Sequence, residues 1–171
     1  NKKSNRPQEN GCHSFAMHYS YSDDGYNLLL EEKEPNGKTT RYSYEDETKL
    51  LKSKFILENE CIRLREFYEY DENALVTCYM VDDGQKEDKD DLIGVSMRKI
   101  RRTQNSRETP VGLPVRIDEF YYDLAKKQEI LLKRTINQFD IRGQLISSSY
   151  YDAKENFLYS NLFQYDSRGN I

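Results

Sequence analysis

A short phrase recurs along this chain: two aromatic residues two positions apart, followed by an acidic residue and a turn. Residues two positions apart lie on the same face only in an extended strand, where side chains alternate between faces. Each copy of the phrase therefore predicts the end of a β-strand. The copies are Tyr19-Ser20-Tyr21, Tyr42-Ser43-Tyr44, Tyr68-Glu69-Tyr70, Phe120-Tyr121-Tyr122 and Phe163-Gln164-Tyr165, with reduced copies that end at Phe139 and Tyr151.

The residues after the second aromatic have the chemistry of tight turns. An Asp at the first turn position can accept the amide hydrogen two residues on, and a Gly three positions later permits a positive φ. We therefore expect Gly143→Ala to destabilise the fold by about 1 kcal/mol or more, and Gly94→Ala, where the pattern is weak, to matter less. The repeat anchors are Tyr21, Tyr44, Tyr70, Asp71, Tyr122, Asp123, Phe139, Asp140, Gly143, Tyr151, Asp152, Tyr165, Asp166 and Gly169.

The anchors recur at a regular spacing. Tyr44 and Tyr70 lie 26 residues apart, as do Phe139 and Tyr165, and Tyr151 divides the second interval into steps of 12 and 14. One strand with one tight turn takes roughly 10 to 13 residues, so a 26-residue unit corresponds to one hairpin. A fixed period of this length predicts a repeat array.

The pattern predicts an antiparallel meander of 10 to 12 strands. A helix is the alternative between Asp123 and Lys133, which contains good helix formers, but a helix would remove the strand that should pair with Tyr122. Pro35-Asn36-Gly37 gives the strongest turn signal. The expected strands are 15–21, 27–33, 38–44, 50–57, 61–70, 75–81, 114–122, 129–139, 144–151 and 157–165, with a further candidate at Val95–Thr103.

Composition agrees with an extended sheet better than with a globule. Only 36% of the 171 residues are hydrophobic, the mean hydropathy is −0.95, and 14 Tyr supply much of the apolar surface. Tyrosine suits a half-buried strand face, because its ring packs while its hydroxyl stays wet. The 26 basic and 30 acidic residues nearly balance. We therefore expect neither nucleic acid nor membrane insertion.

The chain divides into four segments by pattern. Residues 1–14 are expected to be a flexible or incomplete N-terminal segment, and 15–81 a first run of repeat hairpins. Residues 82–113 are the third segment, which begins with a charged loop, Asp82 to Asp91, that we expect to be solvated. The remainder of this segment is expected to be a degenerate repeat or an insertion. Residues 114–171 form a second run that stops in the middle of a repeat. We therefore expect a piece of a longer protein whose neighbouring repeats cover its edges.

The repeated phrase resembles the YD repeat of Rhs proteins, large bacterial polymorphic toxins that are also related to the tyrosine-rich part of animal teneurins. Two copies match aromatic-Asp-x-x-Gly-x-Leu well: Phe139 to Leu145, and Tyr165 to Ile171. The copy at Tyr70 lacks the Gly, and those at Tyr21 and Tyr44 lack the Asp. The resemblance spans roughly residues 15 to 171 and is weakest over 82–113.

This resemblance implies a fold and a role. In Rhs proteins a spiralling β-sheet closes into a hollow shell around a toxic C-terminal domain, and self-cleavage at a core sequence releases that domain. Neither a toxin domain nor that cleavage sequence is recognisable here. The expectation is a non-catalytic wall segment that needs no cofactor. Its partners would be neighbouring repeats and the enclosed toxin domain, and its location would be secreted or on the cell surface.

The sequence evidence for a binding, metal or catalytic site is weaker than the evidence for a structural role. Arg98, Lys99, Arg101 and Arg102 could contact a glycan or phosphate, although adjacent strand residues face opposite sides. Cys12, His13 and His18 lack a fourth metal ligand nearby. Pairs such as Asp118-Glu119 with Asp123 arise by chance among so many acidic residues. Cys12, Cys61 and Cys78 are expected as small apolar strand residues, and one disulfide remains an alternative.

Two other functional classes remain open besides the shell. A Tyr-rich sheet could bind a carbohydrate or a surface receptor, as an adhesion module does, and an enzyme is the third class. The direction of the aromatic face separates the first two, since a lining points inward and a ligand platform points outward.

Overall fold

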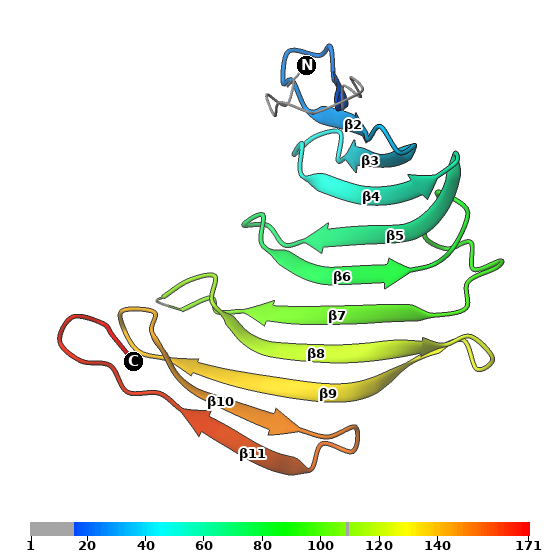
Figure 1. Ribbon diagram of the computed structural model, residues 1–171. Coiled ribbons are helices and arrows are strands. Elements are labelled where there is room, and N and C mark those ends of the chain that lie inside the picture. The colour runs from blue at the N-terminus through cyan, green and yellow to red at the C-terminus, as the bar shows by residue number, and fades with distance from the viewer. Residues whose placement is uncertain (1–15, 109) are drawn as a thin grey trace, which may run out of the picture. The chain divides into compact units, whose positions relative to one another are not determined.

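The computed structural model describes residues 16–108 and 110–171, in which all regular structure is β-strand. The 11 strands are neighbours in chain order (Figure 1). The sequence therefore predicts the fold class correctly, an all-β antiparallel meander. The strands are β1 (His18–Tyr21), β2 (Leu29–Lys33), β3 (Lys38–Tyr44), β4 (Leu51–Glu58), β5 (Cys61–Tyr70), β6 (Val76–Asp82), β7 (Arg98–Asn105), β8 (Pro114–Asp123), β9 (Gln128–Phe139), β10 (Leu145–Tyr151) and β11 (Phe157–Leu162).

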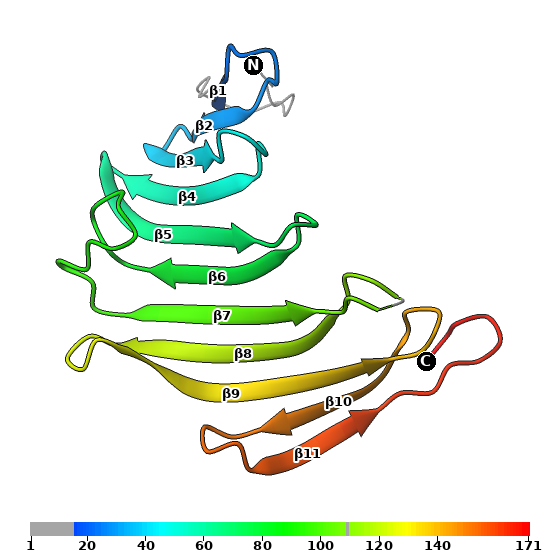
Figure 2. The ribbon, with the colours of Figure 1, turned by 180° about the vertical axis from the view of Figure 1, so that it is seen from behind.

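Five of the 11 strands end at an aromatic anchor. Tyr21, Tyr44, Tyr70, Phe139 and Tyr151 are the last residues of β1, β3, β5, β9 and β10. The helix considered after Asp123 does not form, because β9 begins at Gln128 and pairs with β8 (Figure 2). The final strand is three residues shorter than predicted.

The register shifts where several strands reach their turn. The shifts lie between Ser20 and Tyr21, between Ser43 and Tyr44, and between Tyr150 and Tyr151. A β-bulge of this kind inserts one residue and increases the local twist. The anchor aromatic therefore occupies a bulged position in three strands.

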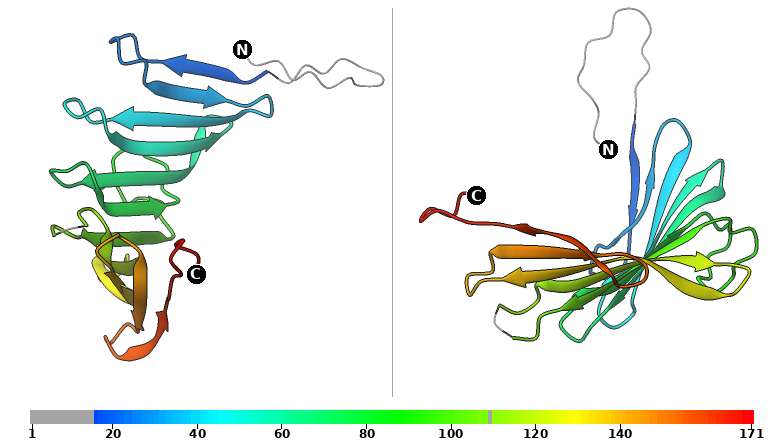
Figure 3. Two further views of the ribbon diagram at one scale, coloured as in Figure 1. Left: turned by 90° about the vertical axis from the view of Figure 1, so that its left-hand side faces the viewer. Right: turned by 90° about the horizontal axis from the view of Figure 1, so that it is seen from below.

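The chain forms two compact units. The first comprises residues 1–67 and 82–96, of which 16–67 and 82–96 are described, and the second comprises 68–81 and 97–171. Strands β1 to β4 lie side by side in the first unit, and β7 to β11 in the second (Figure 3). None of the described residues forms a helix that could cross a membrane.

Polar residues are unusually frequent among the buried ones. Such an interior is stable because most of its polar groups find partners, although the buried Thr39 hydroxyl has no hydrogen-bond partner among the described residues. In the first unit the buried residues are Thr39, Thr40, Ser53, Phe55, Leu57, Ile62, Arg65, Phe67, Asp82 and Val95. In the second they are Cys78, Met80, Arg98, Ile100, Asp118, Thr135, Ser147 and Ser148.

Candidate functional site

The Asp turns share one hydrogen-bond pattern. At Asp140, the backbone N–H donates to the Gln144 carbonyl at 2.9 Å, and the Gly143 N–H donates to the Asp140 carbonyl at 3.0 Å. The carboxylate accepts the N–H of Arg142 at 2.8 Å and of Gln144 at 2.9 Å. One carboxylate thus satisfies two backbone donors that the turn leaves without a strand partner. The same pattern recurs at Asp71, Asp152 and Asp166.

The fourth residue of each of these turns has a left-handed backbone. The φ values are 61° at Ala74, 82° at Gly143, 63° at Glu155 and 84° at Gly169. Gly therefore occupies only two of the four positions that favour it. Gly94 also has a positive φ, 79°. The weak sequence pattern there conceals the same backbone requirement, so we expect replacement of Gly94 to matter about as much as replacement of Gly143.

Hydrogen bonds stabilise the charged form of two turn carboxylates. The Asn156 side-chain amide, and then the Asn156 backbone N–H, hold the pKa of Asp152 below its usual value. The Asn170 side-chain amide does the same for the pKa of Asp166. These carboxylates are therefore acceptors within their turns and poorly suited to general acid catalysis near neutral pH.

Asp123 forms a related but different turn between β8 and β9. Its carboxylate accepts the N–H groups of Ala125 and Lys126, each at 3.0 Å. The Lys126 backbone N–H is the main reason that the pKa of Asp123 lies below its usual value. The left-handed residue here is Lys127, with φ 53°.

Two anchor tyrosines attach to the neighbouring strand. The Tyr44 hydroxyl donates to the Leu29 carbonyl at 2.8 Å, and the Tyr165 hydroxyl donates to the Leu145 carbonyl at 3.0 Å. Both carbonyls belong to the first residue of a strand. Burial raises the pKa of Tyr44, which keeps its hydroxyl a donor. The hydroxyl thus explains why Tyr is useful at this position, a role that ring packing alone does not predict.

The other aromatic anchors lie at or next to strand ends. Tyr21 is 54% exposed. The Tyr122 ring lies 6.0 Å from the Arg98 guanidinium, and the Tyr151 ring packs edge-on against Phe157 at 5.8 Å. Tyr70 and Phe139 close β5 and β9.

The main cluster that the sequence did not indicate surrounds Arg65 on β5. Its side chain is fully buried, and its Nε donates to the Asp82 carboxylate at 2.6 Å. Its Nη atoms donate to the backbone carbonyls of Lys86, Asp88 and Asp91, the last two at 2.8 and 3.2 Å. A buried guanidinium is tolerated because these acceptors replace its water.

Arg65 refines the prediction for Asp82 to Asp91. Residues 85–90 are exposed, as expected of a solvated loop, but Asp82 is only 1% exposed and three loop carbonyls accept hydrogen bonds from one buried cation. Gly84 lies against the guanidinium, and a Cβ there would overlap it. The Asp82 carboxylate also accepts the Gly84 N–H at 2.9 Å. The spacing Asp82-x-Gly84 was the only local signal of this arrangement.

A second ionic cluster lies on β8 and β9. Asp118, 7% exposed, accepts two hydrogen bonds from Arg116, at 3.0 and 2.7 Å, and two from Arg134, at 2.7 and 3.2 Å. Burial alone would raise the pKa of Asp118, but the Arg134 and Arg116 hydrogen bonds outweigh it and lower the pKa. Arg134 also reaches Glu155 at 2.9 Å. Asp118 is thus a structural carboxylate held by two ion pairs. Glu119 pairs with Lys133 at 3.4 Å. Neither carboxylate forms an acid-base pair with Asp123.

The basic residues of β7 do not form one surface. Arg98 is buried, whereas Lys99 and Arg101 are exposed. Arg102 donates to both carboxylate oxygens of Glu129, at 3.0 and 2.6 Å. Strand alternation places Arg98 and Arg102 on the face opposite Lys99 and Arg101. The four candidate contacts for a glycan or phosphate are therefore divided between two faces and partly engaged.

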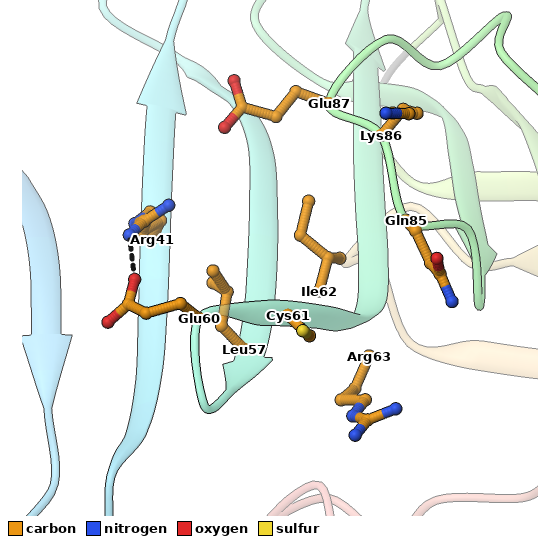
Figure 4. Close-up of a pocket in the computed structure, with 9 residues that line it drawn as sticks. All are labelled: Arg41, Leu57, Glu60, Cys61, Ile62, Arg63, Gln85, Lys86 and Glu87. Atoms are coloured by element: carbon orange, nitrogen blue, oxygen red, sulfur yellow. Dashed lines mark hydrogen bonds and ion pairs between the residues drawn. The ribbon is translucent and has the colours of Figure 1, made fainter.

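A surface pocket of about 410 Å³ opens in the first unit (Figure 4). Leu57, Cys61 and Ile62 lie in its centre, between the pair Arg41–Glu60 on one side and Gln85 and Lys86 on the other. Arg41 donates to Glu60 at 2.8 Å and to Glu31 at 3.1 Å. Arg63 and Glu87 complete a lining that contains no histidine. The pocket thus combines an apolar floor with the Arg41–Glu60 ion pair at its edge, which suits a contact surface.

Cysteines and metal ligands add no site among the described residues. Cys61 is exposed and Cys78 is buried. Within residues 16–108 and 110–171, no three His, Cys, Asp or Glu side chains converge as metal ligands. Cys12 and His13 lie outside the described residues, and His18 lies on β1.

Comparison with known proteins identifies the fold. No family model and no curated protein sequence matches this chain. The crystal structure of TcdB2-TccC3-TEV aligns with a TM-score of 0.52 and 20% identity, over 90% of this chain and 8% of that one. The crystal structure of TcdB2-TccC3-Cdc42 aligns with a TM-score of 0.51 and 20% identity, over 88% and 7%. The chain thus spans a small part of the length of these proteins, and identity at this level shows shared fold. The chain has the fold of a segment of the Rhs/YD-repeat toxin complex TcdB2-TccC3, which confirms the resemblance that its aromatic-Asp phrase indicates.

Proposed function

We propose that this chain is a non-catalytic wall segment of an Rhs-type β-shell, and that the complete shell encloses and delivers a C-terminal toxin domain. The observation that carries the proposal is the fold shared with TcdB2-TccC3 over most of this chain. The repeated turns support it. Because each Asp turn closes a hairpin with the same backbone geometry, hairpins can be added without a change in connection.

The ionic clusters support a structural role. Arg65 is saturated by one carboxylate and three carbonyls, and Asp118 by two guanidinium groups. Groups that catalyse proton transfer or nucleophilic attack must be able to reach a substrate and change their partners. These groups instead keep fixed partners within the protein, as we expect of residues that stabilise a structural segment.

The shell model also specifies partners and location. Neighbouring repeats of a longer chain would pair with the sheet edges, and the toxin domain would lie inside. Delivery of such a cargo requires a secreted or cell-surface protein. The adhesion alternative gains no support from β7, since its basic residues divide between two faces.

Electron microscopy of the protein made from the complete gene tests the proposal. A small epitope inserted after Ile141, which is 88% exposed in its turn, would mark this segment with a bound antibody fragment. We expect a closed hollow particle with the label on its wall and additional density inside. An open or rod-shaped particle, or a label far from any wall, would contradict the shell. The purified 171-residue chain should show no hydrolase, transferase or nuclease activity.

A further inference from the structure

The segment between β6 and β7 contains no strand, and we call its residues 83–96 the strap. Its own backbone hydrogen bonds close short turns, such as the bond from the Val95 N–H to the Leu92 carbonyl at 3.2 Å. At its base the Asp83 carboxylate accepts the Ser96 N–H at 2.8 Å. Because ordering a segment of this kind costs conformational entropy, the strap needs a strong attachment to the neighbouring strand.

Arg65 on β5 supplies that attachment. Its guanidinium donates to the strap carbonyls of Lys86, Asp88 and Asp91, and to the carboxylate of Asp82, the residue that precedes the strap. Four of the five N–H groups of the side chain are engaged in this way. A lysine ammonium carries its donors on one atom and lacks the planar fork that reaches acceptors in several directions. The acceptors therefore select a guanidinium and not only a positive charge.

The rest of the site encloses the same group. Gly84 lies so close to Nη2 of Arg65 that a Cβ atom there would overlap it, and the Gly84 N–H donates to the Asp82 carboxylate at 2.9 Å. The centroid of the Phe67 ring lies 5.4 Å from Cζ of Arg65, and Phe67 is itself only 5% exposed. Carbonyl groups, a glycine without room for a side chain and an aromatic ring thus form a site shaped for a guanidinium.

We propose that the backbone of the strap folds around a guanidinium-binding site, that Arg65 occupies this site in the native chain, and that the strap opens as a unit when the guanidinium is removed. Gln85, Lys86 and Glu87 of the strap line the pocket of the first unit, so an open strap leaves that pocket without one wall (Figure 4). This inference is independent of the proposed function, because all these groups lie in the first unit and act whether or not a shell encloses a toxin.

Chemical rescue tests the proposal. Arg65→Ala removes the part of the side chain that ethylguanidinium can replace, and this ion is then added to the folded variant. Hydrogen exchange of the Gly84, Val95 and Ser96 amides reports on the strap. We expect their exchange to accelerate about tenfold or more in Arg65→Ala, and to return toward the wild-type rate, with saturation, as ethylguanidinium is added at concentrations too low to denature. Ethylammonium has the charge and the alkyl group without the fork of donors, and it should leave the exchange fast.

Two further variants distinguish the guanidinium site from a simple charge interaction. Arg65→Lys keeps the positive charge and should still open the strap. Gly84→Ala places a Cβ atom against the guanidinium and should open the strap although Arg65 is present, and ethylguanidinium should not reverse this opening. Slow amide exchange in β4 and β9 verifies that both units stay folded. Slow strap exchange in Arg65→Ala and Gly84→Ala overturns the proposal, as does a failure of ethylguanidinium to restore Arg65→Ala, or equal restoration by ethylammonium.

Discussion

In the four Asp turns, we expect two reverse substitutions at equivalent positions to change the stability of the fold in opposite directions. Gly143 and Gly169 have a positive φ, which glycine tolerates well. Ala74 and Glu155 adopt the same backbone conformation although they carry a Cβ atom. Gly143→Ala should therefore destabilise the fold, and Ala74→Gly should stabilise it. The two changes are the reverse of each other at equivalent turn positions.

The magnitude follows from two opposing terms. A left-handed backbone costs an L-residue roughly 1 to 2 kcal/mol, while Ala reduces the entropy of the unfolded chain relative to Gly by about 0.4 to 1 kcal/mol. The difference is about 1 kcal/mol in favour of Gly. Steric overlap adds little at Gly143, because a Cβ would lie 3.5 Å from Leu113 Cδ1 and 3.7 Å from Pro110 Cγ.

Equilibrium urea unfolding, followed by circular dichroism, measures both changes. Amide hydrogen exchange in the affected hairpin provides a local measure, since distant hairpins of a repeat sheet can unfold separately. Gly94→Ala is a useful third variant, because Gly94 has the same φ with no atom near its Cβ position and should also lose about 1 kcal/mol. A stabilised Gly143→Ala, or a destabilised Ala74→Gly, would refute the reasoning.

Three further predictions concern the clusters and turns. Arg65→Ala should cost about 3 to 5 kcal/mol by leaving Asp82 buried without its cation, and it should speed tryptic cleavage at the exposed Lys86 and Lys89 by releasing their loop. Arg63→Ala, which changes an exposed residue 3.6 Å from Glu58, should cost at most about 1 kcal/mol. Tyr165→Phe should cost about 0.5 to 1.5 kcal/mol by removing the donor to Leu145, and Tyr26→Phe at a 64% exposed position should be neutral by urea unfolding. The pKa of Asp152 and of Asp166 is lower in the folded state, so the stabilisation is complete above the unfolded value of about 3.9 and is lost as the pH falls through the folded values. In the variants Asp152→Asn and Asp166→Asn, with Asn156 and Asn170 retained, the free energy of unfolding should therefore fall less as the pH is lowered than in the wild type. If the variants and the wild type show the same pH dependence, these carboxylates are not the source of the acid sensitivity.

The fold was predictable because its signals are local and repeated. Alternating aromatics mark strands, and Asp followed by a left-handed residue marks turns, so neither requires knowledge of distant contacts. The strand between Arg98 and Asn105 has no aromatic phrase and was only a candidate, because its pairing with β8 is determined by neighbours rather than by its own pattern.

The Arg65 cluster was not predictable for the opposite reason. Its acceptors are backbone carbonyls 21 to 26 residues further along the chain, and a carbonyl has no sequence signature. A charged segment beside a strand usually indicates a solvated loop. Here the loop is exposed over residues 85–90, but its backbone carbonyls also bind a buried guanidinium, which only the three-dimensional structure reveals.

The copy at Asp71 shows which part of the repeat phrase determines the turn. It lacks Gly, since Ala74 occupies the fourth position, yet its carboxylate accepts the N–H groups of Asn73 and Leu75 at 2.9 and 3.0 Å as the Gly-containing copies do. The carboxylate and the pairing of the flanking strands therefore impose the backbone, and Gly only lowers its cost. The Asp is thus the residue on which regular hairpin closure depends. We therefore expect a sheet assembled from such hairpins to tolerate replacement of the Gly better than loss of the Asp.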